Sequence, residues 1–389
     1  MSTTRSAPTP TDGGDTFEQR VTPLELFFDL VFVFALTQVA GFLANHLTWV
    51  GILQGAAVLA ALWWAWVGYS WLTNAVPAEE VIPARLVILV AMAAMLIASL
   101  AVPEAFDEYG VLFSLAYFVV RLLQVALYAL ATGGTPETRQ AILRLAPGFV
   151  GAPVLLIVAG FLDGLAQGAL WAVALAIDYG VAFVRSPSGF RVHAGHFTER
   201  HGLIIIIALG ESIVAVGVGA SGLGLGAGVV VASVVGIALA AALWWAYFDV
   251  VMLSAERRLS TARGEERVRL ARDSYSYLHL PMVAGIIFVS LGIKKTLAHV
   301  EDPLGTIPAV ALCGGVALYL LGHNAFRLRD VGSVSVPRLV VAILCCALIP
   351  VGVSVSSLLT LAILAGLLCA LAAYETTRYR EFRRKVRAR

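Results

Sequence analysis

One stretch decides the fold of this chain: His196-Phe197-Thr198-Glu199-Arg200-His201-Gly202-Leu203, followed by Ile204 to Ile207 and then by Ala208-Leu209-Gly210-Glu211-Ser212. Ionisable residues lie at the beginning of an apolar run that is long enough to enter a lipid bilayer. If the helix enters the membrane at Arg200, a rise of about 1.5 Å per residue places Glu211 roughly 16 Å deep, near the middle of a ~30 Å hydrocarbon core. A carboxylate at that depth costs several kcal/mol, so it needs a partner, a proton or a water-filled cavity.

The composition places the whole chain in the same class. Of its 389 residues 59% are hydrophobic and 13% are charged, against about 45–50% and about 25% in soluble domains. The mean hydropathy is +0.86, and a soluble core cannot bury so many apolar runs of about 20 residues. We therefore predict an all-α polytopic membrane protein. The cysteines lie inside apolar runs and read as packing residues rather than disulfides or metal ligands: Cys313, Cys345, Cys346 and Cys369.

Twelve apolar segments can be marked along the chain, at 24–44, 49–74, 84–102, 110–132, 148–162, 166–185, 201–219, 228–253, 275–293, 305–323, 337–354 and 356–375. The fifth is short and contains Gly and Pro, which favours a tilted or broken helix. The last two are separated only by Ser354 to Ser357, so a single kinked helix is an alternative to the two helices that we predict.

The basic residues predict the topology. With twelve spans and the N-terminus inside, 24 of the 27 Lys and Arg residues fall on the cytoplasmic side, and only Lys294 and Lys295 fall outside. This asymmetry follows the positive-inside rule for a chain with both termini inside. Residues 1–20 carry no apolar signal sequence and predict a disordered cytoplasmic tail. Residues 377–389 form a polybasic cytoplasmic tail, for which anionic lipids are the expected partners besides the bilayer itself.

An internal repeat is visible in the tryptophan pattern. Ala60-Ala61-Leu62-Trp63-Trp64-Ala65-Trp66 in the second segment reappears as Ala241-Ala242-Leu243-Trp244-Trp245-Ala246-Tyr247 in the eighth. An offset of six helices is even, so the two halves, residues 21–190 and 191–376, would be parallel repeats rather than inverted ones. Two similar aromatic stripes arising by chance are the alternative.

Two stretches resemble the bacterial low-temperature-requirement A (LtrA) family of integral membrane proteins. One is the opening stretch, from His196 to Ser212, and the other is Val21-Thr22-Pro23-Leu24-Glu25-Leu26-Phe27-Phe28-Asp29-Leu30-Val31-Phe32-Val33-Phe34-Ala35. The resemblance covers nearly the whole chain. It implies the bacterial inner membrane and a link to growth at low temperature, but no reaction.

Glu25 and Asp29 are four residues apart and share one helix face. Two carboxylates this close in a low dielectric repel each other unless a cation or an arginine intervenes. The pair therefore indicates either a site for a cation or proton, or a salt bridge to Arg200 that fixes the first helices of the two halves.

Arg121 lies near the middle of the fourth segment and stays protonated at any relevant pH. A carboxylate partner is nearly obligatory, and Glu211 and Asp178 lie at compatible depths. Of the two we predict Glu211, with the fourth and seventh helices in contact, because both residues lie about 11 positions into their helices.

Asp178 and Asp249 lie toward the cytoplasmic ends of their segments, although Asp249 could simply sit at the membrane surface. Acidic residues outnumber Arg121 inside the membrane, which favours protons, metal ions or organic cations over anions as the species handled. The histidines around Glu199 have a usable ligand spacing, but they straddle a loop and a helix start. Capping, with Thr198 as the N-cap, is the better interpretation.

The sequence therefore favours a transporter or channel for protons, cations or small cationic solutes over an enzyme. We predict no catalytic residues, metal site, cofactor or nucleic-acid partner, and the sequence does not indicate an oligomeric state. The expected pathway residues are Glu25, Asp29, Arg121, Asp178, Glu199, Arg200, His201, Glu211 and Asp249. The alternatives are a membrane enzyme or lipid-handling protein that uses Glu199, His201 and Glu211 for acid–base chemistry, and a scaffold whose polar residues serve assembly.

Overall fold

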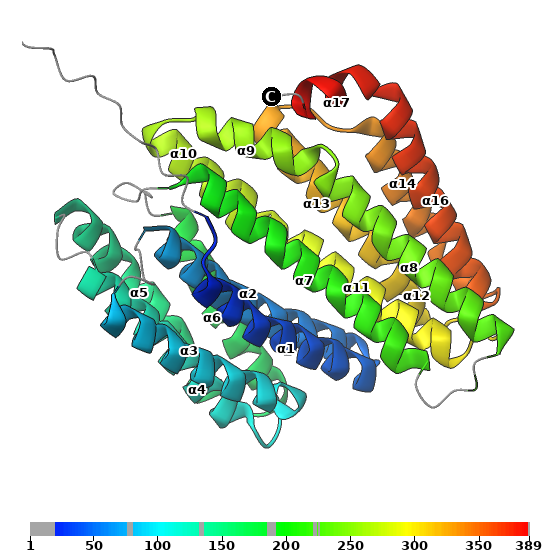
Figure 1. Cartoon of the computed structure of the whole chain (residues 1–389). Coiled ribbons are helices and arrows are strands. Elements are labelled where there is room, and N and C mark those ends of the chain that lie inside the picture. Colours follow the sequence, from blue (N-terminus) through cyan, green and yellow to red (C-terminus); the bar gives the residue numbers. More distant parts are fainter. Residues whose placement is uncertain are drawn as a thin grey trace, which may run out of the picture.

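The computed structural model describes residues 20–75, 81–131, 136–184, 192–220, 224 and 226–387, and these residues form helices and no strand. Figure 1 shows long helices packed side by side along a common direction. Ten helical stretches in this part of the chain are long and apolar enough to cross a membrane, and two shorter apolar helices span Leu143–Ala159 and Val336–Gly352. Each of the twelve predicted segments falls on a helix, so the membrane class of the chain is confirmed.

The first half of the chain forms one group of helices. Its elements are α1 (Pro23–Asn45), α2 (Trp49–Ala75), α3 (Ile82–Ala101), the 3-10 turn η1 (Val102–Glu104), α4 (Gly110–Ala131), α5 (Pro136–Ala159) and α6 (Gly164–Val184). Helix α1 packs on α2 and α3, and α3 to α6 pack successively on one another. Helix α6 returns to α2 and closes the group.

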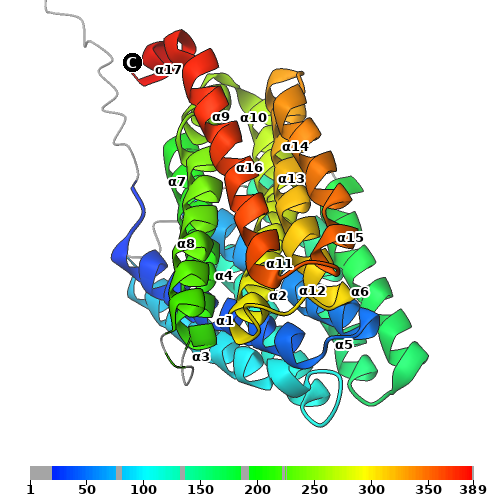
Figure 2. The same ribbon diagram turned by 90° about the vertical axis from the view of Figure 1, so that its right-hand side faces the viewer.

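The second half forms a longer series. It consists of α7 (Ala194–Ala220), α8 (Ala227–Phe248), α9 (Val251–Thr261), α10 (Gly264–Leu270), the π-helical turn η2 (Ala271–Tyr277), α11 (His279–Ala298), α12 (Thr306–Ala309), the π-helical turn η3 (Val310–Gly314), α13 (Gly315–Val331), α14 (Val336–Ala347), α15 (Ile349–Gly352), α16 (Ser357–Arg378) and α17 (Arg380–Arg387). Helix α7 packs on α8 and α11, α11 on α13, α13 on α14, and α16 returns to α8. Figure 2 shows α8 and α16 side by side on this part of the molecule.

The two groups meet where α1 and α2 pack against α7 and α11. Helices α1 and α7 run in the same direction, because contacts pair Glu25 with His196 near both helix starts and Thr37 with Glu211 farther along. Their ribbons lie next to each other in the centre of Figure 1. The opening stretch of the sequence therefore lies at the junction of the two groups.

Helix α5 and the pair α14 and α16 correspond to the two segment predictions that left alternatives open. The fifth apolar segment is short, as predicted, and spans Leu143–Ala159. It is not broken: it lies within α5, a continuous helix of 24 residues that begins at Pro136, because the polar residues before the apolar run continue the helix. The last two segments are separate helices, as predicted. Helix α14 ends at Ala347, and Ser356 caps the next helix by accepting a hydrogen bond from Leu359 N.

Close backbone approach holds α11 against α13. A methyl group added at Gly285 would lie 2.6 Å from the Gly315 carbonyl oxygen, and one added at Gly315 would lie 2.7 Å from the Gly285 carbonyl oxygen. Only glycine fits at these two positions, which is a common device for packing membrane helices.

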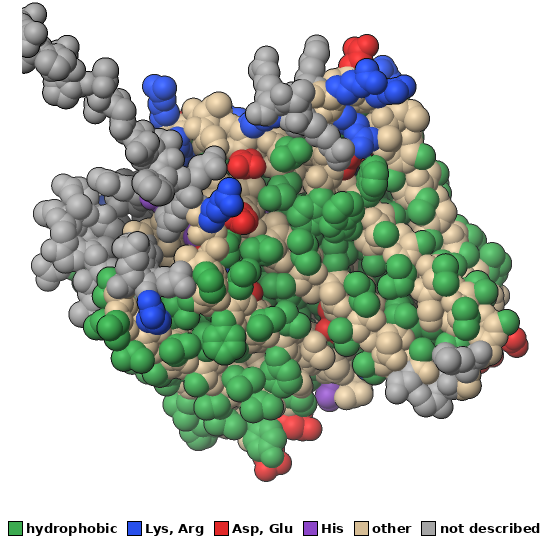
Figure 3. Space-filling view, in the orientation of Figure 1, with side chains coloured by type: hydrophobic (Ala, Val, Ile, Leu, Met, Phe, Trp, Pro, Cys, Tyr) green, Lys and Arg blue, Asp and Glu red, His purple; other side chains and the backbone are tan. Residues whose placement is uncertain are grey.

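The surface fits a surrounding bilayer. Figure 3 shows hydrophobic side chains over most of the visible face, with Lys and Arg gathered near α9, α10 and α17 at the upper edge. Large side chains such as Leu53, Leu30 and Val234 are 71%, 62% and 64% exposed. In lipid this exposure carries no hydrophobic cost, since the tails are as apolar as leucine.

Candidate functional site

The start of α1 places two carboxylates at the junction. Thr22 caps the helix: its side chain accepts from Glu25 N, and the Glu25 carboxylate accepts from Thr22 N at 2.8 Å. This capping box fixes the entry of the chain into the helix and orients Glu25. Asp29 follows one turn later on the same face, and both side chains are buried, with 3% and 2% of their surface exposed.

The start of α7 supplies the partners. His196 Nε2 lies 2.9 Å from Glu25 Oε1. Arg200 Nη2 lies 3.1 Å from Asp29 Oδ1, and Arg200 Nη1 lies 3.8 Å from Glu25 Oε1. The sequence left open whether Glu25 and Asp29 bind a cation or pair with Arg200, and the pairing with Arg200 is present. His196 was not among the predicted pathway residues, although it opens the deciding stretch.

Helix α2 completes this cluster. Trp66 Nε1 donates to Asp29 Oδ1 at 2.9 Å, and the Arg200 guanidinium lies 5.6 Å from the centre of the Trp66 ring. Trp66 and Arg200 are fully buried. We call Glu25, Asp29, Trp66, His196 and Arg200 the junction cluster. It draws on three helices from both halves of the chain.

The hydrogen bonds of Asn74 define the tautomer of a neutral His196. The Asn74 side chain accepts from His193 N at 2.9 Å and donates to His193 O at 3.0 Å, which fixes the orientation of its amide. The same Nδ2 group lies 3.0 Å from His196 Nδ1, so this ring nitrogen is an acceptor. In this arrangement a neutral His196 carries its proton on Nε2 and donates it to Glu25.

The charges of the junction cluster do not balance. Glu25 and Asp29 contribute two negative charges when ionised, Arg200 contributes one positive charge, and a neutral His196 contributes none. The cluster thus has an excess of one negative charge in a buried environment, where an uncompensated charge is expensive. A proton on a carboxyl group or a bound monovalent cation would balance it.

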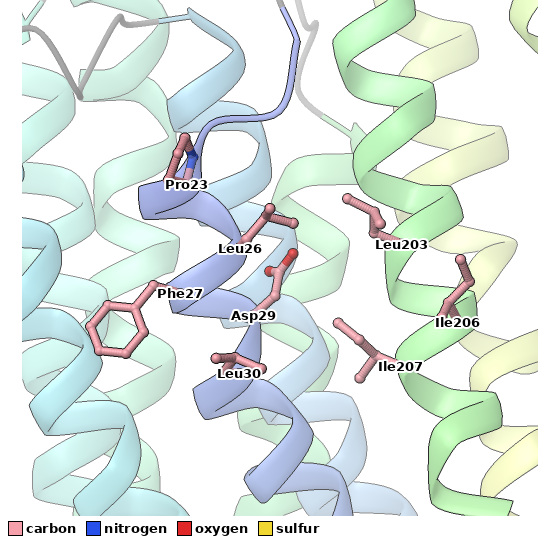
Figure 4. A pocket seen from close by; sticks show the side chains of 8 residues that line it. All are labelled: Pro23, Leu26, Phe27, Asp29, Leu30, Leu203, Ile206 and Ile207. Carbon is pink, nitrogen blue, oxygen red and sulfur yellow. The ribbon is translucent and has the colours of Figure 1, made fainter. Parts of the chain in front are cut away.

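One carboxylate oxygen of Asp29 has no hydrogen-bond partner among the described residues. Its Oδ1 atom is bound by Trp66 and Arg200, whereas Oδ2 is buried and has no hydrogen-bond partner among the described residues. Figure 4 shows the carboxylate at a groove between α1 and α7 whose other residues are apolar: Pro23, Leu26, Phe27, Leu30, Leu203, Ile206 and Ile207. The sequence predicted Asp29 as a pathway residue but did not predict this groove, because a groove depends on how two helices far apart in the sequence pack.

A second polar contact lies farther along the same two helices. Thr37 on α1 donates to Glu211 Oε2 on α7 at 2.6 Å, and Glu211 is 6% exposed. Thr37 is eight residues beyond Asp29, which is about 12 Å along a helix. We refer to the boundary of α1 and α7, from the junction cluster to Glu211, as the α1/α7 seam.

The predicted pairing of Arg121 with Glu211 is wrong. Arg121 Nη2 lies 2.6 Å from Asp178 Oδ1 on α6, and both side chains are almost fully buried. Tyr117 donates to the other Asp178 oxygen at 3.3 Å, and Arg121 also donates to Gln124 Oε1 at 3.0 Å. Depth in the membrane allowed either partner. The packing decides for Asp178, because α4 and α6 both pack on α2 and α5 inside the first half.

The remaining predicted residues lie apart from the junction cluster or at its edge. Glu199 accepts from Val21 N at 3.1 Å, just before α1. Asp249 follows α8 and binds Arg383 of α17. The prediction that Thr198 caps α7 is wrong, because the helix begins at Ala194; Thr198 lies inside it and its hydroxyl is 3.3 Å from that of Tyr275.

Comparison with known proteins identifies the family. The profile of the family described as "Bacterial low temperature requirement A protein (LtrA)" matches residues 20–373. The chain belongs to the LtrA family. It is also 32% identical over 312 residues to "Uncharacterized protein RA0937" of Rhizobium meliloti (strain 1021), a match that covers 77% of this chain and 75% of the relative. No solved structure matches the chain.

In this LtrA protein His201 has an enclosed, aromatic environment. Its Nδ1 donates to Phe197 O at 2.8 Å, and the rings of Trp66, Tyr275 and His279 lie 5.1 to 5.2 Å from its own. His201 is fully buried, and its Nε2 atom has no hydrogen-bond partner among the described residues. The ring therefore packs between the two halves, about one and a half turns along α7 from His196.

The π-helical turn η2 also joins the halves of the LtrA chain. Trp63 and Trp71 on α2 donate to the carbonyl and hydroxyl oxygens of Ser276, each at 2.8 Å, and His279 Nδ1 lies 2.9 Å from Ser274 O. A π-helical turn alters the backbone hydrogen bonding of a helix, and such turns are frequent at functional sites. Nothing in the sequence pattern signalled this turn, because its residues are ordinary helix residues.

Proposed function

We propose that this LtrA-family protein moves protons or small monovalent cations across the bacterial inner membrane along the α1/α7 seam. The observation that carries the proposal is the junction cluster, which is buried, spans both halves and has an excess of one negative charge. Such a cluster is stable with one additional positive charge and less stable without it. Binding and releasing that charge is the elementary step of ion transport.

The position of the junction cluster supports this reading. Transporters built from two repeats place their ion and substrate sites at the boundary between the repeats. We infer that residues 21–190 and 191–376 are parallel six-helix halves with both termini inside. In support, α1 packs on α2 and α3 as α7 packs on α8 and α11, and α6 returns to α2 as α16 returns to α8. The asymmetry of basic residues agrees with that orientation.

Glu211 provides the next position for the charge. Its carboxylate has Thr37 as its hydrogen-bond donor and lies about two turns beyond Asp29 along the seam. Intramembrane carboxylates arranged in a series are typical of proton and ion pathways. In this proposal a cation or proton binds at Asp29 and is passed toward Glu211.

The enzymatic alternative loses support from the same geometry. Glu199 binds the backbone before α1, His201 lies among aromatic rings, and Glu211 binds Thr37. Acid–base chemistry needs its groups within hydrogen-bond reach of one reacting centre. These three residues have separate partners at separate positions along α7, so they do not form such a centre.

Flux into proteoliposomes tests the proposal. Purified protein would be reconstituted, and proton, Na⁺ and K⁺ movement would be followed with ion-sensitive dyes under an imposed gradient. We expect flux that is lost in Asp29→Asn and reduced in Glu211→Gln. Asp249→Asn is the matched control, since the same chemical change falls outside the seam and should leave flux intact. A folded wild-type protein that moves none of these ions would overturn the proposal.

Two further properties are proposals of the same kind. A requirement for growth at low temperature is inferred from the family description, and a deletion strain complemented with wild type or Asp29→Asn would test it. Binding of anionic lipids by the tail is inferred from its basic residues. Within that tail, Arg383 binds Asp249 and lies 5.7 Å from the centre of the Trp245 ring.

A further inference from the structure

The groove between α1 and α7 opens toward the surface that faces lipid. Its volume is about 390 Å³, within the range of about 300–1,000 Å³ that is usual for small-molecule sites. Leu26, Leu30 and Ile206 line it and are 44%, 62% and 47% exposed. A molecule dissolved in the bilayer can therefore reach the groove sideways, without passing through water.

Asp29 is the polar residue of this groove. Figure 4 shows its carboxylate on the side of α1 that faces α7, at the level of Leu26 and Leu203. The side chain as a whole is 2% exposed, and Oδ2 lacks a donor while Oδ1 has two. A buried acceptor without a partner is unfavourable, and more so when it is charged, so a ligand that brings a donor to Oδ2 is stabilised there.

The surrounding charges determine which donor fits. The ionisable groups that face Asp29 are Glu25 on its own helix and Arg200 and His196 on α7. Their sum with Asp29 is one negative charge, with His196 neutral. A cationic donor is therefore preferred over a neutral hydroxyl, and the apolar walls favour a long hydrocarbon chain attached to it.

We propose that the groove binds long-chain primary ammonium ions that enter from the bilayer. The ammonium group donates to Asp29 Oδ2, and the chain lies against Leu30, Leu203 and Ile207. This inference rests on the proposed function, because it adds an organic monovalent cation, bound from the lipid side, to the ions that the junction cluster accepts. A quaternary ammonium ion fits less well, since it has no N–H to satisfy Oδ2.

Calorimetric titration with dodecylammonium tests the site. The protein would be placed in nanodiscs of zwitterionic phosphatidylcholine, and empty nanodiscs would give the background from partition into lipid. We expect saturable binding that is about tenfold or more tighter than that of dodecyltrimethylammonium or dodecanol, since a charge-assisted hydrogen bond is lost with either. Asp29→Asn should weaken dodecylammonium binding by a similar factor.

A second variant keeps the test decisive if Asp29→Asn fails to fold. Leu30→Trp fills the groove from an exposed position and should abolish binding, whereas Leu53→Trp adds the same ring at an exposed site on α2 and should leave it unchanged. Equal binding of dodecanol and dodecylammonium, or unchanged binding in both groove variants, would overturn the inference. Ion flux without ammonium binding would refute this site and leave the proposed function standing. Ammonium binding without any ion flux would support the groove as a binding site and refute the proposed transport function.

Discussion

The two copies of the Ala-Ala-Leu-Trp-Trp-Ala-aromatic sequence have nearly the same residues and opposite environments. In the first copy, on α2, Trp63, Trp64 and Trp66 are 0%, 4% and 0% exposed. In the second copy, on α8, Trp244 and Trp245 are 44% and 39% exposed. Only the last aromatic position is buried in both copies, as Trp66 in one and Tyr247 in the other.

The difference arises from what surrounds each helix. Helix α2 contacts α1, α4, α6, α7 and α11, so the side chains of its residues 61–70 are buried on every face of the helix. Helix α8 packs on α7, α9, α11 and α16, and part of its circumference faces outward. The shared buried position makes a polar contact in each copy: Trp66 donates to Asp29, and Tyr247 OH lies 2.8 Å from His279 Nε2. The repeated sequence thus conveys one inward-facing aromatic position, and the environment of the other two aromatic positions depends on the tertiary structure.

The largest expected effect separates the two copies directly. Trp66→Ala should destabilise the protein by about 3–5 kcal/mol, because it opens a cavity and removes a hydrogen bond from Asp29. Trp244→Ala removes an exposed ring and should change stability by about 0.5 kcal/mol or less. Thermal and denaturant unfolding of both variants in the same detergent would measure the difference. Equal losses would show that the exposed ring of α8 is buried in an assembly or by a partner.

A smaller difference is expected between the ion pairs that attach the last helix of each half. Arg121 binds Asp178 on α6 with both side chains 1–2% exposed, and Arg338 binds Glu375 on α16 with 11% and 19% exposed. Arg121→Gln should cost about 3–5 kcal/mol, since it leaves a buried carboxylate unpaired. Arg338→Gln should cost less, because water or lipid headgroups can reach Glu375.

A double variant controls for this interpretation. Replacing Asp178 by Asn together with Arg121→Gln should restore part of the lost stability, since no unpaired charge remains. Unfolding measurements on the two single variants and the double variant give the coupling between the residues. Strictly additive losses would mean that Arg121 and Asp178 do not act as a pair in the folded protein.

The smallest effect concerns the tail that covers the second copy. Arg383→Gln breaks the contact of α17 with Asp249 and with the ring of Trp245. Both side chains are only 11–12% exposed, but α17 is a short helix at the end of the described chain, so the loss of stability should be about 1 kcal/mol. Limited trypsin digestion should nevertheless cleave the tail faster than in wild type. An unchanged cleavage rate would show that other contacts hold α17, with Arg384→Gln as the control variant.

The candidate site was found in part from the sequence. Glu25, Asp29 and Arg200 could be singled out, because charged residues in apolar segments are costly and therefore informative. His196 and Trp66 were not selected as pathway residues, since a histidine at a helix start and a tryptophan in an aromatic stripe have ordinary structural explanations. Their contacts join residues more than a hundred positions apart, or on different helices, and no periodicity encodes such contacts.

The sequence by itself determined the membrane class, the approximate positions of the apolar helices and the charged residues that lie within them. These follow from hydropathy and from the fixed rise of a helix, both of which are local properties. The tertiary structure decided which residues at the same depth meet. Arg121 forms its ion pair with Asp178 rather than with Glu211, and Arg200 forms one with Asp29 across the α1/α7 seam. The depth of a residue depends only on its distance along one helix. Which residues form an ion pair depends on which faces of different helices pack together, and that packing involves all of the helices at once.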